Sequence, residues 1–341
     1  MFEDKRVLVT GGTGSLGRQI VLYLLACGAT EVRVFSRDQG RQQRMADELK
    51  TDSCGSKDGT VSFVAGDVRD AKALARATRD IDIVFHTAAL KHVPICEQHV
   101  MKAVATNVLG SSNVIRAALQ NGVDRVLAIS TDKAVRPVSV MGITKALQEQ
   151  LFIEAAAHAA GAGTVFCTMR AGNLLGSSGS VVPLFKQQIE AGGPVTVTCP
   201  SATRFVMTVE EAVTLACDAV HWAVGGEILV PRLPAFRIGM LAQVMIQALA
   251  AGEDIKVTEI GLRPGERLHE VLVSDTERGG TIWHEPFFVI LPELDLPETR
   301  DHYREAPAVD LGPDGEWSSR TAPLLTSAEL RSKLRQGRCL P

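Results

Sequence analysis

Short apolar runs alternate with helix-like stretches along the first half of the chain. Helical periodicity appears at 19–26 and from about 142 to 159. The apolar runs have the length of buried strands, at residues 6–10, 31–35, 61–65, 81–86 and 125–130. Strands that alternate with helices in this way predict an α/β fold built on a doubly wound parallel sheet.

A glycine-rich segment, GGTGSLG at 11–17, lies between the first expected strand and its helix. Glycines at this place permit a tight turn and a close approach of the backbone to a pyrophosphate, whose charge then rests at the helix N-terminus. The order of strand, glycines and helix predicts dinucleotide binding, and a purely structural turn is the alternative. The expected cofactor contacts are Gly11, Thr13, Gly14, Ser15 and Leu16.

The residues after the second strand bear on the choice of cofactor. NAD-binding proteins of this class usually have a carboxylate where this chain has Ser36, because it accepts a hydrogen bond from the ribose 2′-hydroxyl. The neighbouring Arg37, together with Arg41, suits a 2′-phosphate instead. We therefore expect NADP over NAD, while Asp38 beside them argues the other way.

Further cofactor contacts are expected at the ends of the third and fourth strands. Asp67 follows the third strand, in place to meet the adenine amino group. Small residues follow the fourth strand and let the backbone pass close to the cofactor. The set of contacts predicted here is Asp67, Val68, Ala88, Ala89, Lys91 and Asn107.

A polar stretch after the fifth strand leads into the helix that begins near residue 142. Ligands of open α/β sheets bind at the carboxyl ends of the strands. Thr131, Asp132 and Lys133 offer a hydroxyl, a carboxyl and an amine side by side, and Lys145 supplies a second amine. We expect the chemistry here. The alternative is a capped helix start, with Asp132 and Ser139 as caps and the lysines solvated.

Composition narrows the function to small-molecule chemistry. The chain has 341 residues, enough for one large α/β domain and a smaller one, and its net charge of -3 gives no long-range attraction to nucleic acid or to an anionic membrane. Its seven cysteines and eight histidines lack metal-ligand spacing, so no metal site is expected. Without a signal-peptide pattern or an apolar run that spans a bilayer, a cytoplasmic protein is the expectation.

Several motifs together resemble one branch of the extended short-chain dehydrogenase/reductases, the UDP-N-acetylglucosamine 4,6-dehydratases of the 5-inverting kind. The resemblance runs to about residue 320. It rests on the glycine pattern, Asn107, Ser130 and Lys145, and on SRD at 36–38, AALKHVP at 88–94, STDK at 130–133, GN at 172–173, GSVVP at 179–183, TRF at 203–205 and GLRPGERLHE at 261–270.

The resemblance implies a division of labour. Residues 1–170 are expected to form an NADP-binding Rossmann domain, which also receives segments from about 205–240. Residues 171–341 are expected to form mainly a nucleotide-sugar-binding lobe and a C-terminal tail. The family tends to form homo-oligomers, so we expect a dimer or a hexamer. The implied contacts with a UDP-sugar are Lys91, Asn173, Val181, Arg204, Arg263 and Glu266. Two of the last four polar residues named, Asn173, Arg204, Arg263 and Glu266, could equally form exposed ion pairs.

The family's chemistry assigns roles to the polar stretch. Oxidation of C4 of the sugar by NADP makes the C5 proton acidic. By resemblance, Thr131 holds the 4-hydroxyl, Lys133 takes the C5 proton and Asp132 gives a proton to the departing C6 hydroxyl, while Lys145 holds the nicotinamide ribose. These roles require a neutral Lys133 and a protonated Asp132, the reverse of their usual states, so the two are expected to titrate as a coupled pair.

The chain departs from the family pattern at three places. Met141 stands where the catalytic Tyr is usual, as in some other members, so Lys133, Asp132 acting through Thr131, or a water must take the 4-hydroxyl proton. Ala171 and Ser178 replace a usual Tyr and Arg, which leaves the sugar and the nucleotide base open. A nucleotide-sugar epimerase and a non-catalytic NADP-binding regulator are the alternatives to a dehydratase, which is a lyase.

Overall fold

The large sheet has the doubly wound order expected from the sequence. The computed structural model describes residues 1–51, 59–159, 161, 163–177, 179–250, 252, 254–263, 265–312 and 314–341. The strand order is β14-β15-β10-β6-β5-β4-β1-β2-β3, parallel from β3 to β10 and antiparallel at β15 and β14. The strands are β1 (Arg6–Thr10), β2 (Glu31–Ser36), β3 (Thr60–Ala65), β4 (Ile83–His86), β5 (Arg125–Thr131), β6 (Val165–Ala171), β10 (Ile228–Pro231), β14 (Thr281–His284) and β15 (Phe287–Ile290).

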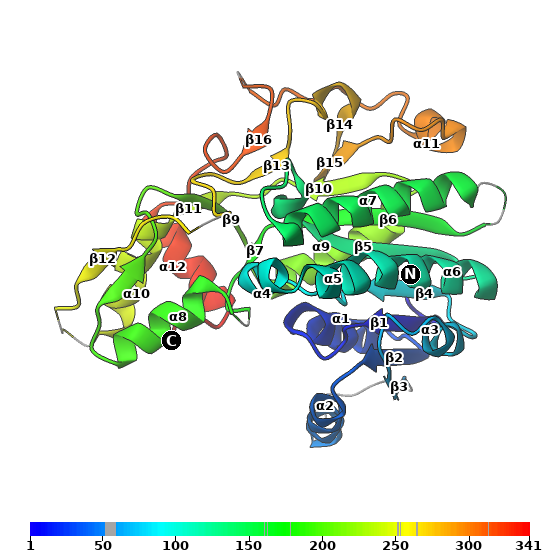
Figure 1. The fold of residues 1–341 in the computed structure, drawn as a ribbon, viewed down its shortest axis with the longest axis horizontal. Coiled ribbons are helices and arrows are strands. Elements are labelled where there is room, and N and C mark those ends of the chain that lie inside the picture. The colour runs from blue at the N-terminus through cyan, green and yellow to red at the C-terminus, as the bar shows by residue number, and fades with distance from the viewer. Residues whose placement is uncertain are drawn as a thin grey trace.

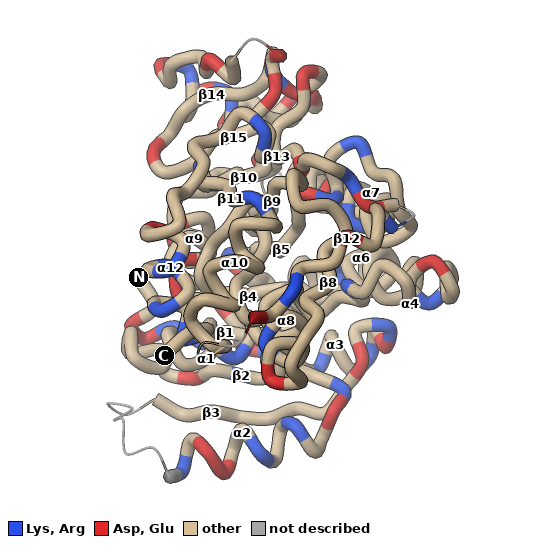
Figure 2. Tube along the Cα trace, turned by 90° about the vertical axis from the view of Figure 1, so that its left-hand side faces the viewer, with Lys and Arg blue, Asp and Glu red and all other residues tan. Residues whose placement is uncertain are grey.

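Helices cover both faces of this sheet, which confirms the predicted α/β class (Figure 1). One apolar core packs against α1 (Ser15–Ala26), α2 (Gln39–Thr51) and α9 (Val209–Trp222). The core on the other face packs against α3 (Ala71–Ala77), α6 (Gly110–Asn121) and α7 (Val140–His158). Basic and acidic positions are intermixed along the outer helix α2 (Figure 2).

Short helical segments follow β4 and β5 at the carboxyl edge of the sheet. They are α4 (Val93–Gln98), α5 (Val100–Ala103), the π-helical turn η1 (Val104–Leu109) and the 3₁₀ turn η2 (Asp132–Ala134). Because the order of the strands reverses between β1 and β4, these segments surround the place where doubly wound sheets bind ligands.

A smaller lobe begins where β6 runs through Gly172 into β7 (Asn173–Leu174), and so lies beyond the carboxyl ends of the parallel strands (Figure 1). It has its own apolar core, formed largely by helices α8 (Val181–Glu190), α10 (Ile238–Leu249) and α12 (Ser327–Gln336). Its strands are β7, β8 (Val195–Val197), β9 (Thr203–Met207), β11 (Ala235–Arg237) and β12 (Val257–Glu259).

The remaining elements connect the lobe to the large sheet. Strand β13 (Val271–Val273) pairs with β16 (Trp317–Ser318), while η3 (Arg278–Gly280) leads into the hairpin β14–β15. This hairpin lies in the range that we assigned mainly to the smaller lobe, yet it pairs with β10 and extends the large sheet. Helix α11 (Pro297–His302) follows it. Among the described residues, none of the helices combines the length and the apolarity that a membrane crossing needs.

A buried ion cluster ties the central strands together. Arg170 of β6 contacts Glu149 of α7 at 2.8 Å and Glu277 at 2.6 Å, with only 3% of its side chain exposed. Glu149 also accepts a hydrogen bond of 2.5 Å from Ser130 of β5. Because each charge has an opposite partner, the cluster is compatible with burial and fixes β5 next to α7.

Replacement of Arg170 tests this cluster. Arg170→Met leaves Glu149 buried without its positive partner, and such a break typically costs about 3–5 kcal/mol, so the free energy of unfolding in urea should fall by about that much. The control Arg300→Met removes an exposed pair with Asp295 at 2.7 Å. It should cost about 0–1 kcal/mol. Equal small losses in both variants would contradict a structural role for the cluster.

Candidate active site

The glycine loop packs against the segment that follows β4, so two of the predicted cofactor segments meet. Gly11 has a φ of +71°, and a Cβ there would lie 2.8 Å from the backbone nitrogen of Ala88. A Cβ on Gly17 would lie 2.5 Å from the carbonyl oxygen of Gly11. The turn therefore requires glycine at both places. It brings Thr13, Gly14 and Ser15 to the N-terminus of α1, whose Leu16 is buried, and sets Gly11 beside Ala88, the residue before Ala89.

The ends of β2 and β3 form a polar group at the edge of the sheet. Ser36 is buried, and its hydroxyl accepts a hydrogen bond of 3.1 Å from Gln42. Asp67 is held by Arg69 at 2.7 Å and lies 3.7 Å from Arg37. Burial alone would raise the pKa of Asp67, but the hydrogen bonds and charge of Arg69 and the charge of Arg37 lower it. Asp67 is therefore an anion that competes with any phosphate for Arg37.

Two other predicted cofactor residues at this edge have local partners. Arg41 lies 3.3 Å from Asp38, whose carboxylate also accepts its backbone N–H at 2.9 Å. Val68 is buried, and its carbonyl accepts a hydrogen bond of 2.9 Å from Asn113. The guanidinium of Arg41 thus starts from an exposed ion pair, which is weak in water.

The three polar residues at the end of β5 are in direct contact. The hydroxyl of Thr131 donates a hydrogen bond of 2.6 Å to Oδ1 of Asp132, and Nζ of Lys133 lies 3.0 Å from the same oxygen. The Asp132 side chain is 2% exposed and that of Lys133 is 31% exposed. Of the two caps in the alternative interpretation, Ser139 does cap α7 by accepting the N–H of Gly142, but the Asp132 carboxylate binds its neighbours instead of capping a helix.

A second carboxylate near Lys133 comes from a distant part of the sequence. Oε1 of Glu270 lies 3.5 Å from Nζ of Lys133 and 3.7 Å from Nε of Arg204. Burial alone would lower the pKa of Lys133, but the carboxylates of Asp132 and Glu270 outweigh it and raise that pKa. The arrangement favours the ammonium form, so the neutral Lys133 that we expected requires transfer of its proton to a carboxylate.

Lys145 and Met141 lie one turn apart on α7. Nζ of Lys145 donates hydrogen bonds of 2.6 Å to the carbonyl of Ile129 and 2.8 Å to Oε1 of Gln148. Burial lowers the pKa of Lys145 to about 8. Met141 is buried in a small apolar cluster with Cys96, and its side chain has no group that titrates. The position of the usual tyrosine is therefore apolar in this chain.

Asn107 joins three segments around the switch point. Its Oδ1 accepts the backbone N–H of Leu90 at 2.7 Å, and its Nδ2 donates to the carbonyl of Leu90 at 3.0 Å and to the hydroxyl of Thr144 at 2.9 Å. It thereby orients the segment after β4 against α7. The adjacent Lys91 is exposed, and partial burial of its amine lowers its pKa.

The predicted substrate residues divide into two groups. Arg204 and Glu266 form an ion pair of 2.9 Å, and the backbone N–H of Arg263, whose side chain is exposed, donates to Glu266 at 3.2 Å. Asn173 lies on β7, opposite Val206 of β9, and its buried Oδ1 has no hydrogen-bond partner within the described part of the chain. Val181 begins α8.

Of the two other positions where the chain departs from the family pattern, the structure describes one. Ala171 is buried at the end of β6. Ser178 lies outside the described residues.

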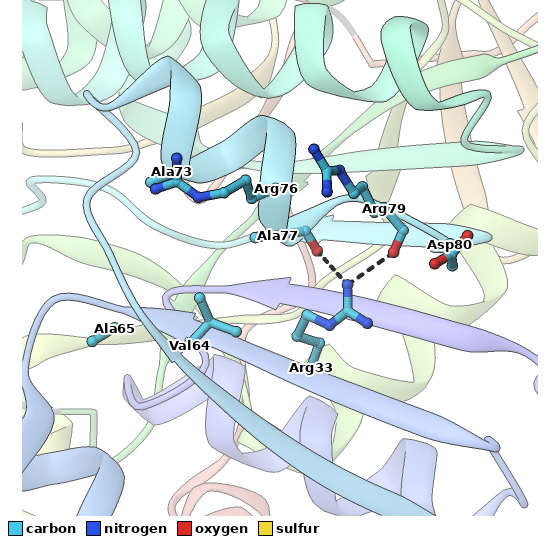
Figure 3. A pocket seen from close by; sticks show the side chains of 8 residues that line it. All are labelled: Arg33, Val64, Ala65, Ala73, Arg76, Ala77, Arg79 and Asp80. Carbon is cyan, nitrogen blue, oxygen red and sulfur yellow. Dashed lines mark hydrogen bonds between the residues drawn. The ribbon is translucent and has the colours of Figure 1, made fainter.

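One cavity, of ≈ 340 Å³, lies away from these residues (Figure 3). Its lining includes Arg33 of β2, Val64 of β3 and Arg76 of α3. Arg33 is already bound to the carbonyl oxygens of Ala77 at 2.8 Å and Arg79 at 2.9 Å. Because β3 is the edge strand, four places from β5, this cavity is separate from the group at Asp132.

Sequence reasoning missed two residues of the site. Glu270 entered only as the last letter of the GLRPGERLHE motif, with no role, and Gln42 was not considered. Gln42 is buried on α2 and donates to Ser36 and to the carbonyl of Val64 at 3.0 Å. A buried Gln on a polar helix was the available signal for Gln42, whereas nothing local indicates the contact between Glu270 and Lys133.

Comparison with known proteins gives a consistent relationship. Residues 7–292 match the family described as polysaccharide biosynthesis protein. An uncharacterized membrane protein of Methanocaldococcus jannaschii is 44% identical over 296 residues, which is 85% of this chain and 87% of the relative. A UDP-glucose 4-epimerase of Rickettsia akari is 42% identical over 281 residues, which is 81% of this chain and 80% of the relative.

Solved structures agree with the fold. Pen from Bacillus thuringiensis has a TM-score of 0.88 at 34% identity, over 98% of this chain and 99% of that one. DesIV, a dTDP-glucose 4,6-dehydratase from Streptomyces venezuelae solved with NAD, has a TM-score of 0.68 at 21% identity, over 98% and 97%, and shares the extended short-chain dehydrogenase/reductase fold. With most of its length matched, the chain belongs to the polysaccharide biosynthesis protein family.

Proposed function

We propose that the chain is an NADP-dependent nucleotide-sugar 4,6-dehydratase, a lyase that acts on UDP-N-acetylglucosamine with inversion at C5. The observation that supports this most is the contact between Thr131, Asp132 and Lys133 at the carboxyl end of β5, where Nζ of Lys133 and the Thr131 hydroxyl share one oxygen of a buried carboxylate. An acid and a base side by side suit an elimination, which must add one proton and remove another.

In this proposal the chain's own residues move two protons. Lys133 removes the C5 proton, and Asp132 supplies a proton to the departing C6 hydroxyl. Since the carboxylates of Asp132 and Glu270 raise the pKa of Lys133 and favour its ammonium form, transfer of its proton to Asp132 across 3.0 Å prepares both groups at once. Bound NADP supplies the oxidation at C4 and the later return of hydride. Each acid or base step contributes about 10²- to 10⁴-fold to the rate.

The apolar Met141 leaves the 4-hydroxyl proton to another group. The Thr131 hydroxyl already donates to Asp132 at 2.6 Å. Asp132 can hold only one proton, and in this proposal that proton comes from Lys133. The 4-hydroxyl proton therefore leaves to a water, while the Thr131 hydroxyl accepts a hydrogen bond from the 4-hydroxyl and orients it. Lys145, held by Ile129 and Gln148, is left to bind the nicotinamide ribose.

The glycine loop fits the proposed cofactor. A Cβ at Gly11 would strike the backbone of Ala88, so the backbone of the loop packs directly against the segment after β4. Such a close turn before a helix is the arrangement in which loop and helix N–H groups bind a pyrophosphate. In our proposal the residues 1–170, with segments from about 205–240, hold NADP, and Arg37 and Arg41 bind its 2′-phosphate. The smaller lobe at 171–341, with Asn173, Arg204, Arg263 and Glu266, holds the UDP-sugar.

A nucleotide-sugar 4-epimerase is the second candidate, because the Rickettsia akari relative and a second relative of the same identity are both UDP-glucose 4-epimerases. Epimerization uses the same oxidation at C4 but needs no acid for a leaving hydroxyl. Incubation with UDP-N-acetylglucosamine, followed by proton NMR in heavy water, separates the candidates. A 6-deoxy-4-keto product with deuterium at C5 supports the dehydratase, a C4 stereoisomer supports the epimerase, and no reaction would favour a non-catalytic NADP-binding protein.

We also propose that the chain forms a homo-oligomer through α4, α5 and α7. These helices contact one another and expose several large apolar side chains. The exposed group comprises Ile95, Val100, Met101, Ile143 and Leu147 of these helices, together with Val138 just before α7. Exposed apolar patches of this kind mark interaction sites.

Variants of the acid and base should separate the half-reactions. Lys133→Ala should abolish deuterium exchange at C5, because Lys133 is the proposed base and no other amine of the described residues forms an ion pair with Asp132. Asp132→Asn should still reduce the cofactor but stall before elimination, because an amide is too weak an acid to protonate the departing hydroxyl. Proton NMR and the NADPH absorbance measure the two steps, and the exposed Lys72→Ala is the control. Normal turnover by either site variant would refute the roles assigned.

A variant of Arg37 tests the choice of cofactor. Arg37→Ala should weaken NADP binding about 10- to 100-fold, the effect of one or two charged hydrogen bonds, and leave NAD binding unchanged. Calorimetric titration with each dinucleotide measures both constants. Lys50→Ala, at the exposed end of α2, is the matched control. If wild-type protein prefers NAD, or if Arg37→Ala weakens both equally, the NADP assignment is wrong.

Charge on the apolar surface tests the oligomer. The double variant Met101→Asp and Ile143→Asp should lower the mass measured by light scattering to that of one chain, because carboxylates at an interface are costly to desolvate. Leu294→Asp, an exposed leucine elsewhere, should keep the wild-type mass. A monomeric wild type, or a double variant with the wild-type mass, would contradict this surface.

A further inference from the structure

The carboxylate of Glu270, a residue distant from Lys133 in the sequence, lies next to the Lys133 amine. Its side chain is 5% exposed, and its Oε1 lies 3.5 Å from Nζ of Lys133. A carboxylate so deeply buried must have a partner of opposite charge or a proton. Burial and the nearby Asp132 raise the pKa of Glu270, against the charges of Lys133, Arg204 and Arg267.

The position of Glu270 is fixed by its backbone. Its N–H donates to the hydroxyl of Ser319 at 2.9 Å, and its carbonyl accepts the N–H of Ser319 at 2.8 Å. The Ser319 hydroxyl also donates to the carbonyl of Thr203 at 3.2 Å. Three chain segments, including β9, therefore hold Glu270 in place.

Arg204, the other cation near Glu270, has better partners. Its guanidinium is 2.9 Å from Glu266 and donates to the carbonyl oxygens of Thr203 at 2.8 Å and Leu268 at 3.2 Å. Its distance to Glu270 is longer, at 3.7 Å. Because Glu266 neutralises Arg204, the charge of Glu270 remains available to Lys133.

The proposed reaction gives this second carboxylate a task. When Asp132 carries the proton for the C6 hydroxyl it is neutral, and Glu270 is then the one carboxylate among the described residues that still contacts Lys133. Building on the proposed dehydratase, we infer that Glu270 is a positioning residue that holds the Lys133 amine and stabilises its positive charge while it removes the C5 proton. In that step the C5–H bond breaks, an N–H bond forms on Lys133, and the electron pair moves toward the C4 carbonyl.

Removal of the Glu270 charge should change the titration of Lys133. The charged groups that face Lys133 are Asp132, Glu270 and Arg204, and those that face Glu270 also include Arg267. An opposite charge at this range shifts a pKa by about one to three units. Glu270→Gln keeps the size of the side chain and loses the charge, so the pKa of Lys133 should fall by about one to three units.

The pH dependence of Lys133 acetylation measures this pKa. The full-length protein is labelled with acetic anhydride across a pH series, and mass spectrometry of the peptide that contains Lys133 gives the midpoint. We expect the midpoint at lower pH in Glu270→Gln and a smaller shift in Glu270→Asp, which keeps the charge. Asp275→Asn, which removes an exposed carboxylate paired with Arg136, is the control and should leave the midpoint unchanged.

The outcomes separate this inference from the proposed function. An unchanged midpoint in both Glu270 variants, or an equal shift in the Asp275 control, overturns the role of Glu270 even if the wild type forms the 6-deoxy-4-keto product. A lowered midpoint in Glu270→Gln supports the contact whatever the product. Where turnover is present, the low-pH limb of C5 deuterium exchange should move by the same amount, and a fixed limb would count against the role.

Discussion

The proposed chemistry depends on one arrangement, the burial of the Asp132 carboxyl between the Thr131 hydroxyl and the Lys133 amine. Thr131 and Lys133 bind the same carboxylate oxygen, at 2.6 and 3.0 Å. The Asp132 side chain is 2% exposed and that of Lys133 is 31% exposed, so the carboxylate depends on its protein neighbours in place of water. The large sheet supplies this pair at the end of β5, and Glu270, which itself lies near Arg204, contacts Lys133 from the C-terminal half of the chain.

The two parts of the chain contribute different things to the site. The large sheet and its helices fix three features of the site by local contacts. These are the glycine loop after β1, the hydrogen bonds of Asn107 to Leu90 and Thr144, and the hydrogen bond from Lys145 to the carbonyl of Ile129. The C-terminal segments supply charge, and their backbone is held through Ser319.

The sequence predicted the parts of the fold that depend on local pattern. Apolar runs located β1, β2, β3 and β5 to within about one residue because each of these strands carries a short run rich in apolar residues, even where charged residues interrupt it as in β2. The first helix begins at Ser15, earlier than the periodicity suggested, because the glycine loop forms its first turn. The hairpin β14–β15 was not placed in the sheet, since its partner β10 is about 60 residues away and register across such a distance leaves no local signal.

The candidate site divides in the same way. Thr131, Asp132 and Lys133 are neighbours in the chain, so their contact was predictable from sequence. Glu270 reaches Lys133 only because β13 pairs with β16 and Ser319 fixes the backbone, and these are tertiary contacts. Its charge adds to that of Asp132 in raising the pKa of Lys133, so the expected proton transfer from Lys133 to a carboxylate starts from an amine whose ammonium form is favoured.

A crystal structure of the protein with NADP bound tests the central claim most directly. The account predicts that the nicotinamide ring lies against the Thr131–Lys133 segment, with Lys145 at its ribose, so that a sugar bound beside the ring touches both Asp132 and Lys133. A ring bound elsewhere, or side chains at 131–133 turned away from it, would contradict the account.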